Sequence, residues 1–431
     1  MKLRWNRSSD EYSSSRFFHV LDAAFEYFQA ILLAGTYLAK LTSSLGISDS
    51  LTGILSSIIA LGGTFRIASV YLFPTQPVKG RVMIFEVLNQ LLTIALYLIP
   101  LFDFPKSVGV VLFAVVLISH HMMLNVSFPA KVSWTTGLVD DRKRGRFTAV
   151  KEMISLISGV IFTYSMGAVI DKYDALGRPA EAFPVCAWVL AGLFVIRVLL
   201  LALIREKPVP KKAASSSGGM RAILSQPVMR RLVGLNVLIY VAQYVSTPFL
   251  GTYQVNELGF SMTFVATLSL VYSAVRIVAS FFLGAYADKK GFAAMMQICF
   301  ALMALAFGVN MFTAPSNGRV MFTLYYSLYA MAMGGVNSGA TNLVFDYAKR
   351  EQRSQALAVY SSVGGLAGFL TTLLVSPLVA HIQAAGNMLF GMPVYAQQVM
   401  SGVSLVMMGV LMLYMQKGIL TMPRPGETQN Q

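Results

Sequence analysis

The chain of 431 residues is 56% hydrophobic and only 12% charged, and its formal net charge is +15. Soluble domains carry roughly 25% charged residues, so this composition excludes an ordinary soluble domain and predicts an integral membrane protein. The positive charge does not require a nucleic-acid partner, because cytoplasmic loops of membrane proteins are enriched in Lys and Arg. The two cysteines, Cys186 and Cys299, lack the spacing of metal ligands, and we expect neither a metal nor a cofactor.

Twelve apolar segments are long enough to cross a membrane as helices, which takes about 20 residues. In chain order they are Phe17–Leu41, Ser50–Phe73, Val82–Leu101, Val108–Val132, Phe147–Ile170, Phe183–Ile204, Leu232–Gln254, Met262–Ala287, Phe292–Thr313, Val320–Leu343, Ala356–His381 and Pro393–Gln416. Their uniform apolar character, without alternation, argues against a transmembrane β-barrel. Most of the 34 Lys and Arg residues then share one side with both termini. We therefore expect a multi-pass protein of the cell membrane, inner or plasma, with cytoplasmic N- and C-termini.

The chain contains an internal repeat. The segment Arg144–Val150, followed by Gly159, matches the segment Arg353–Val359, followed by Gly368, at a constant offset. Shorter matches precede these in the same order: Gly35–Tyr37 with Gly251–Tyr253, Leu45–Gly46 with Leu258–Gly259, and Arg66–Ile67 with Arg276–Ile277. Parallel repeats in a membrane chain are typical of transporters. We expect an all-α membrane fold of twelve transmembrane helices, in two six-helix bundles related by pseudo-twofold symmetry.

The two bundles are expected at residues 1–204 and 232–416. Between them, the stretch 205–231 is rich in Lys, Ser and Gly and predicts a flexible cytoplasmic linker that ends in an amphipathic helix at the membrane surface. The stretch 417–431 predicts a disordered cytoplasmic tail.

A turn after the eighth segment resembles a family signature. Gly284–Gly291 reads Gly-Ala-Tyr-Ala-Asp-Lys-Lys-Gly and is similar to the Gly-x-x-x-Asp-(Arg/Lys)-x-Gly turn of the major facilitator superfamily, and Gln226–Leu232 resembles that family's entry to its seventh helix. Two features depart from the family pattern. The turn Pro74–Arg81 lacks the aspartate, and the antiporter motif of a Gly-Pro followed by paired glycines is missing from Phe147–Ile170. The resemblance covers essentially the whole chain and implies a transporter that moves a small-molecule substrate by alternating access.

The signature turn is expected to act as a cytoplasmic gate. Asp288 lies between Gly284 and Gly291. By the repeat, its target should be the start of the fifth segment at Arg144 or Arg146, where a helix N-terminus favours an anion.

Three acidic residues are predicted to lie at membrane depth. Asp22 and Glu26 are four residues apart in the first segment and share one helix face, and Glu86 lies in the third segment. A charge at the centre of a membrane helix costs at least about 2.5–3.5 kcal/mol, so it needs a partner or a function. We expect these carboxylates to couple protons or bind substrate. The alternatives are that Asp22 and Glu26 are structural partners of Arg66, or that Asp22 lies near the lipid headgroups.

Basic and histidine residues inside the segments form a second group of candidates. Arg66 and Arg276 occupy matching places of the second and eighth segments, which indicates either a duplicated bracing role or anion binding. Arg197 is expected to extend to the cytoplasmic interface. The fourth segment carries adjacent histidines and an asparagine that predict either a proton relay or hydrogen-bonded packing; they are His120, His121 and Asn125.

The candidates in the second half are uncharged. Asn236, Tyr240 and Gln243 form one stripe of the seventh segment, and Asn337 lies in the tenth. Amides and tyrosine suit hydrogen bonds to a small polar solute in a substrate cavity. Hydrogen bonds between packed helices are an equal alternative.

These features predict a secondary active transporter that is coupled to protons, works as a monomer in the lipid bilayer and is not an enzyme. Three alternatives stay open. They are a membrane receptor that does not transport, an integral-membrane enzyme that uses His120 and His121, and a drug or metabolite efflux antiporter. Symport and antiport are both compatible with the sequence.

Overall fold

The computed structural model describes residues 11–66, 68–73, 77–139, 144–207, 223–348, 353–389 and 391–422. These residues form α-helices with short 3-10 and π-helical extensions, and one hairpin of two-residue strands, β1 (Met388–Leu389) and β2 (Met392–Pro393). Most of the predicted linker, residues 208–222, and most of the predicted tail, residues 423–431, lie outside the described residues. The start of the tail, expected to be disordered, is helical, because Met415–Ile419 form a π-helix.

The helices group into two compact units. The first unit comprises Met1–Tyr37, Ser44–Gly46 and Phe65–Ala213, and the second comprises Leu38–Ser43, Ile47–Thr64 and Ala214–Gln431. The grouping thus places part of the stretch 1–204 with the second unit. The domain bounds expected from the sequence stay a prediction.

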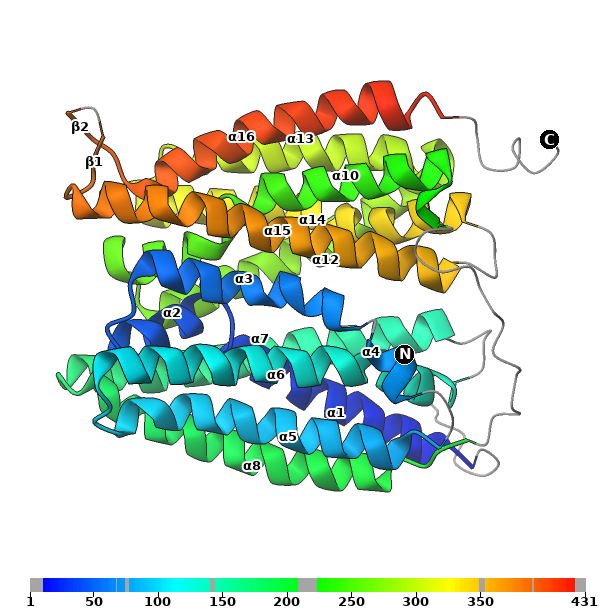
Figure 1. Ribbon diagram of the computed structural model, residues 1–431, viewed down its shortest axis with the longest axis horizontal. Coiled ribbons are helices and arrows are strands. Elements are labelled where there is room, and N and C mark those ends of the chain that lie inside the picture. The colour runs from blue at the N-terminus through cyan, green and yellow to red at the C-terminus, as the bar shows by residue number, and fades with distance from the viewer. Residues whose placement is uncertain are drawn as a thin grey trace. The chain divides into compact units, whose positions relative to one another are not determined.

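The first unit is built mainly of long helices. Its elements are α1 (Ser13–Leu32), the start of α2 (Gly35–Ser44), α4 (Ala68–Leu72), α5 (Lys79–Leu98), η1 (Ile99–Leu101), α6 (Lys106–Thr136), α7 (Arg144–Ala175), η3 (Pro179–Glu181) and α8 (Ala182–Leu203). Within it, α1 packs on α7 and α8, and α5 packs on α6 and α8. Figure 1 shows α5, α6 and α8 running alongside one another.

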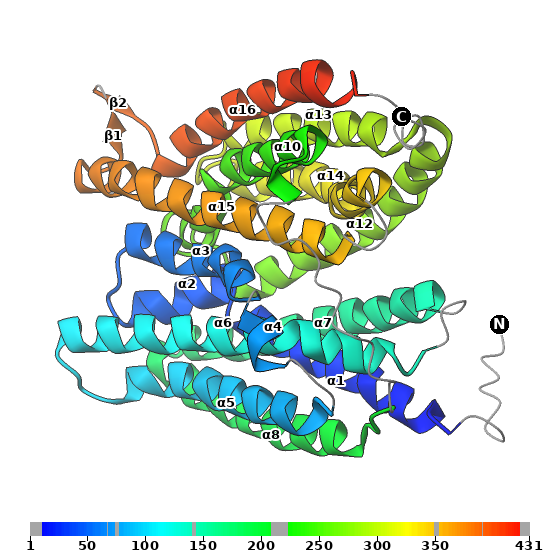
Figure 2. The ribbon, with the colours of Figure 1, turned by 45° about the vertical axis from the view of Figure 1, so that its right-hand side comes forward.

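The second unit has a larger apolar core. Its elements are α3 (Asp49–Phe65), α10 (Pro227–Tyr244), η4 (Thr247–Phe249), α11 (Leu250–Thr252), η5 (Tyr253–Glu257), α12 (Met262–Lys290), α13 (Phe292–Asn310), α14 (Gly318–Tyr347), α15 (Arg353–Ala384), the hairpin, α16 (Ala396–Tyr414) and η7 (Met415–Ile419). Fully buried members of the core include Met295, Phe300, Phe307, Phe322 and Met408. In Figure 2, α10, α13 and α16 lie side by side, as their packing contacts require.

The sequence repeat has a counterpart in the packing. In the first unit α1 packs on α7, and in the second unit α10 packs on α15. In the first unit α5 also packs on α6 and α8. In the second unit the corresponding helix, α13, packs on α14 and α16. Each unit therefore repeats the same set of helix neighbours, because matching apolar faces of the two sequence copies find matching partners.

Nine helices in the described part of the chain are long and apolar enough to cross a membrane, or up to ten if α1 and α2 form one span. Those two helices meet at a bend of 47°, where Gly35 adopts a φ of +52° that favours glycine. The other two predicted segments fall outside this count: α3 is only 17 residues long and α14 carries polar residues such as Asn337 and Asn342. A helical membrane protein is thus confirmed, and the number twelve stays a prediction.

Candidate functional site

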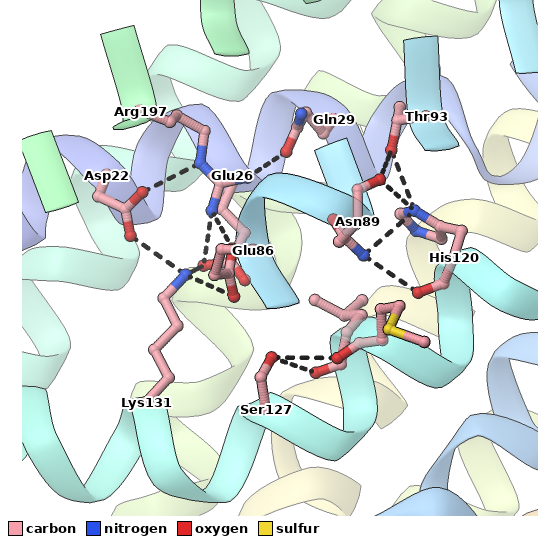
Figure 3. A network of polar contacts seen from close by, with 12 residues as sticks. Asp22, Glu26, Gln29, Glu86, Asn89, Thr93, His120, Ser127, Lys131 and Arg197 are labelled. Carbon is pink, nitrogen blue, oxygen red and sulfur yellow. Dashed lines mark hydrogen bonds and ion pairs between the residues drawn. The ribbon is translucent and has the colours of Figure 1, made fainter. Parts of the chain in front are cut away.

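Five charged side chains meet inside the first unit. Asp22 and Glu26 come from α1, Glu86 from α5, Lys131 from α6 and Arg197 from α8, and we call this set the charge cluster. Figure 3 shows Lys131 on one side of the three carboxylates and Arg197 on the other. Four helices that are far apart in the sequence thus each supply a charge to one buried place.

Arg197 holds the cluster from the side of α8. Its Nε donates to Oδ1 of Asp22 at 3.0 Å, its Nη2 donates to Oε2 of Glu86 at 2.9 Å, and its Nη1 donates to the side-chain oxygen of Gln29. Only 1% of its side chain is exposed. The expectation that Arg197 extends to the interface is therefore wrong. A guanidinium is buried when its donors meet anions in good geometry, and here two carboxylates and an amide supply that compensation.

Lys131 holds the cluster from the opposite side. Its Nζ lies 2.9 Å from Oε2 of Glu26, 3.2 Å from Oδ2 of Asp22 and 3.4 Å from Oε1 of Glu86. From the sequence, Lys131 is expected among the basic residues of the cytoplasmic segments, because it stands at the predicted end of the fourth segment, and this expectation is wrong. The structure continues α6 as far as Thr136, which leaves Lys131 buried within the helix.

The cluster carries an unbalanced charge. Three carboxylates against two cations leave one formal negative charge when every group is ionised. Asp22 and Glu86 are 0% and 1% exposed, whereas the side chain of Glu26 is 28% exposed. Burying a net charge is expensive. The cluster is therefore a place where one additional positive charge is favoured, and Glu26 is its most accessible acid.

Several buried polar atoms around the cluster have no hydrogen-bond partner among the described residues. They are Nδ1 of His19, Nε2 of Gln29 and both side-chain heteroatoms of Gln90. Gln90 is fully buried on α5, one turn beyond Glu86. Buried polar groups are normally paired with protein or ordered water, so this region has spare capacity for a bound water, ion or solute.

The structure places the predicted histidine group in the packing of α5 against α6. His120 Nδ1 lies 3.2 Å from Nδ2 of Asn89 and 3.0 Å from Oγ1 of Thr93. His121 is buried with its ring against His120, at 4.9 Å between centroids. Asn125 Nδ2 donates to the backbone oxygen of His121 at 2.9 Å. These contacts give each of the three a packing partner.

Arg66 and Arg276, the two arginines predicted at matching places of the repeat, lie in different surroundings. Arg66 follows α3 and donates from Nε to Oδ1 of Asn125 at 3.1 Å, and its guanidinium lies 4.6 Å from the centroid of the Phe128 ring. The carboxylates Asp22 and Glu26 have Lys131 and Arg197 as partners. Arg276 lies half-buried on α12.

The predicted stripe on α10 meets an aromatic group that sequence analysis did not single out. Asn236 is buried and donates to the backbone oxygen of Tyr360 at 2.6 Å, and Tyr240 stacks on Tyr244 at 5.4 Å between ring centroids. Gln243 Oε1 accepts from the hydroxyl of Tyr329 at 2.8 Å. Asn337, in contrast, is exposed on α14.

Two glutamines and three tyrosines from four elements come together here. Gln254 Nε2 donates to the hydroxyl of Tyr326 at 3.0 Å, and the ring of Tyr272 lies 6.0 Å from that of Tyr326 and 6.5 Å from that of Tyr329. We call Gln243, Gln254, Tyr272, Tyr326 and Tyr329 the tyrosine–glutamine cluster. The signal for it in the sequence was the spacing of Tyr325, Tyr326 and Tyr329 within about one helical turn.

The signature turn lies at the end of α12. Gly284 lies within that helix, Asp288 is exposed on its last turn, and Gly291 has a φ of +89° that lets the chain turn into α13. Arg144 and Arg146 begin α7, but their side chains lie outside the described part of the structure. The gate contact expected from the sequence stays a prediction.

A chain of long apolar helices with polar and charged groups enclosed in the bundle is built like a membrane transporter. The sequence comparison agrees with this class. The chain belongs to the Major Facilitator Superfamily, because the model of that family matches residues 20–372. It is thus a multi-pass membrane transporter rather than an enzyme, with a small molecule as its substrate. A comparison with curated protein sequences gave no match.

Solved structures of transporters share the fold. The nucleoside transporter NupG superposes with a TM-score of 0.68 at 14% identity, covering 94% of this chain and 99% of that one. A D-xylose-proton symporter gives 0.69 at 14% identity, covering 96% and 98%. An auto inhibited POT family peptide transporter gives 0.69 at 13% identity, also covering 96% and 98%. At such identities the similarity concerns the fold, and the predicted family membership is confirmed independently by the sequence.

Proposed function

We propose that the protein is a secondary active transporter that moves a small polar solute by alternating access, coupled to protons at the charge cluster. The observation that carries the proposal is the cluster's single unbalanced negative charge inside the first unit. One proton neutralises it. A charge change at a buried site alters the relative stability of conformations that hydrate the site differently, which is the requirement for ion coupling.

Within the cluster, Glu26 is the proposed proton acceptor. Asp22 and Glu86 are both held by Arg197 at about 3 Å, whereas the nearest approach of Arg197 to Glu26 is 3.9 Å. Glu26 is also the most exposed of the three acids. Asp22 and Glu86 then act as the fixed counter-charges of Arg197 and Lys131. The role of His120 and His121 is packing in this proposal, and Asn125 connects that group to Arg66.

The tyrosine–glutamine cluster is the proposed place for contacts with the solute in the second unit. Its five side chains offer amide groups, hydroxyl groups and flat aromatic faces. Such a set suits a solute with hydroxyl or amide groups on a compact ring. The nucleoside transporter and the D-xylose-proton symporter among the structural neighbours carry solutes of that kind by their names. Of the four cavity residues predicted from the sequence, Gln243 remains in this proposal, whereas Asn236, Tyr240 and Asn337 do not.

The remaining features of the proposal follow from the sequence. The protein works as a monomer in the cell membrane, with both termini in the cytoplasm, and Asp288 contributes to closing the cytoplasmic side. A transport-inactive receptor is the rival function, and drug efflux by antiport is the rival direction. The missing antiporter motif in Phe147–Ile170 favours symport over antiport.

The test begins with finding a solute. Nucleosides, pentoses, hexoses and dipeptides are screened for a rise in the melting temperature of the purified protein, because a ligand that binds the folded state stabilises it. The solute that binds is then followed into proteoliposomes under an imposed pH gradient. We expect the wild type to accumulate it and Glu26→Gln to exchange it across the membrane without accumulation. Full accumulation by Glu26→Gln would remove Glu26 as the coupling residue, and a bound solute that never crosses would favour the receptor.

A further inference from the structure

Lys131 is placed as a cation would be placed in a site of three carboxylates. Its Nζ lies 2.9, 3.2 and 3.4 Å from oxygens of Glu26, Asp22 and Glu86. Only 5% of its side chain is exposed. Carboxylate oxygens are the ligands that hard cations prefer, and an ammonium group with three donors occupies the same kind of position.

Arg197 fixes the carboxylates in the orientation that forms this position. It binds Oδ1 of Asp22 and Oε2 of Glu86, whereas Lys131 approaches Oδ2 of Asp22 and Oε1 of Glu86. Each of these carboxylates therefore gives one oxygen to the guanidinium and turns the other toward Nζ (Figure 3). Arg197 therefore orients the two carboxylates, and the ammonium group of Lys131 occupies the position between them.

The surroundings contain spare ligands. Gln90, fully buried and one turn beyond Glu86 on α5, has no hydrogen-bond partner among the described residues for either heteroatom of its side chain. Oδ2 of Asp22 and Oε1 of Glu86 have the Nζ of Lys131 as their ion-pair partner and form no hydrogen bond with another described residue, so removing Lys131 would free both oxygens. Among the described residues, the other ionisable groups near the cluster include His19 on α1, Lys151 on α7, whose charge acts on His19, and His120 on α6, on which the charge of Arg197 acts. Neutral oxygens next to carboxylates can complete the shell of a small cation.

We propose that Lys131 is a tethered cation that fills an alkali-cation site and thereby makes the transporter independent of sodium. Lys131 is thus the residue that determines the specificity for the coupling ion, and this inference rests on the proposed coupling role of the cluster. With Lys131 present, the cluster has one unbalanced charge and needs one proton. Without it, two negative charges are unbalanced, and a soluble cation such as Na⁺ can take the vacated position.

The experiment measures the melting temperature of the full-length protein in detergent, in sodium chloride and in choline chloride at equal ionic strength and pH. The wild type should melt at the same temperature in both salts. Lys131→Ala should melt several degrees higher in sodium chloride, because a cation that binds only the folded state stabilises it. Lys131→Arg, which keeps a tethered cation, should show no difference. Lys151→Ala removes a nearby positive charge without vacating the site, and it should also show none.

Two results would overturn the proposal. One is a sodium-specific stabilisation of the wild type, and the other is a folded Lys131→Ala variant that does not distinguish the salts. If Lys131→Ala is recovered poorly, its folded yield is compared after purification in each salt. A higher yield in sodium supports the proposal, and equal loss in both salts rejects it. This experiment measures cation binding, whereas the test of Glu26 measures solute flux. A failure of the sodium site can therefore be distinguished from a failure of proton coupling at Glu26.

Discussion

At the scale of single residues, the charge cluster shows what a sequence can and cannot reveal. Asp22, Glu26 and Glu86 could be predicted as candidates, because acids are rare at membrane depth. Lys131 and Arg197 could not be assigned to them, because both lie near predicted segment ends where long basic side chains often reach the interface. Which cation meets which acid depends on how α1, α5, α6 and α8 pack, and a pattern within one segment carries no such information.

Removing Arg197 should destabilise the first unit strongly. In Arg197→Leu, the oxygens now bound at 3.0 and 2.9 Å on Asp22 and Glu86 lose their donor while they stay buried. Breaking a buried ion pair by deleting one partner costs about 3–5 kcal/mol. The measurement is the unfolding free energy in detergent.

The matched control for that variant is Arg178→Leu. Arg178 pairs with Glu181 at 3.7 Å, but both side chains are more than half exposed. Exposed pairs contribute about 0–1 kcal/mol, so this variant should unfold almost like the wild type. Equal effects of the two substitutions would contradict the role given to Arg197.

At the scale of elements, the hydrogen bond between Tyr329 and Gln243 connects α14 to α10. Tyr329→Phe should destabilise the second unit by about 0.5–1.5 kcal/mol, because Gln243 Oε1 then loses a partly buried hydrogen bond. If the tyrosine–glutamine cluster contacts the solute, the same variant should also bind it more weakly. Both effects are read from melting temperatures with and without solute.

Tyr325→Phe is the control for Tyr329→Phe. The hydroxyl of Tyr325 is buried, lies on the same helix and has no hydrogen-bond partner among the described residues. Its removal should leave stability unchanged or raise it slightly, because no partner is left unpaired. A loss as large as that of Tyr329→Phe would show that ring packing, and not the hydroxyl, is what matters at both positions.

The helices themselves were largely predictable, because long apolar runs leave few alternatives in a membrane. Each of the twelve predicted segments corresponds to helix in the structure. The interruptions were not predictable from apolar character alone. The bend at Gly35 and the break after α3 both fall within runs that read as continuous. Hydropathy averages over a window, whereas a bend is decided by the φ and ψ angles of one or two residues.

At the scale of the whole molecule, the two units repeat their helix neighbours but differ in their polar interiors. The first unit encloses the charge cluster, and the second brings together tyrosines and glutamines. The duplication therefore accounts for the shared helix packing of the two units, and later sequence changes account for their different polar side chains. This division could be anticipated from the sequence, because Asp22 and Glu26 have no acidic counterparts in the stripe of Asn236, Tyr240 and Gln243.

The gate expected at Asp288 can be tested on the whole transporter. Asp288→Asn should make single-cysteine reporters at the predicted cytoplasmic mouth react faster with a thiol reagent, because the outward-open state loses a stabilising charge. Lys290→Gln, a change at an exposed residue of the same turn that the signature does not specify, serves as the control. Unchanged labelling in Asp288→Asn would remove Asp288 from the gate.

The four-helix origin of the charge cluster also has a consequence for how the protein is made. Helices enter a membrane in the order of synthesis, and an unpaired charge at the centre of a lone helix costs at least about 2.5–3.5 kcal/mol. The carboxylates of α1 and α5 precede Lys131, and Arg197 arrives only with α8. Inserting α1 or α5 into lipid alone, with its carboxylates unpaired, is therefore unfavourable in free energy. All five charges of the cluster are present only after α8 is inserted, so we expect the helices of the first unit to reach their final packing late and together.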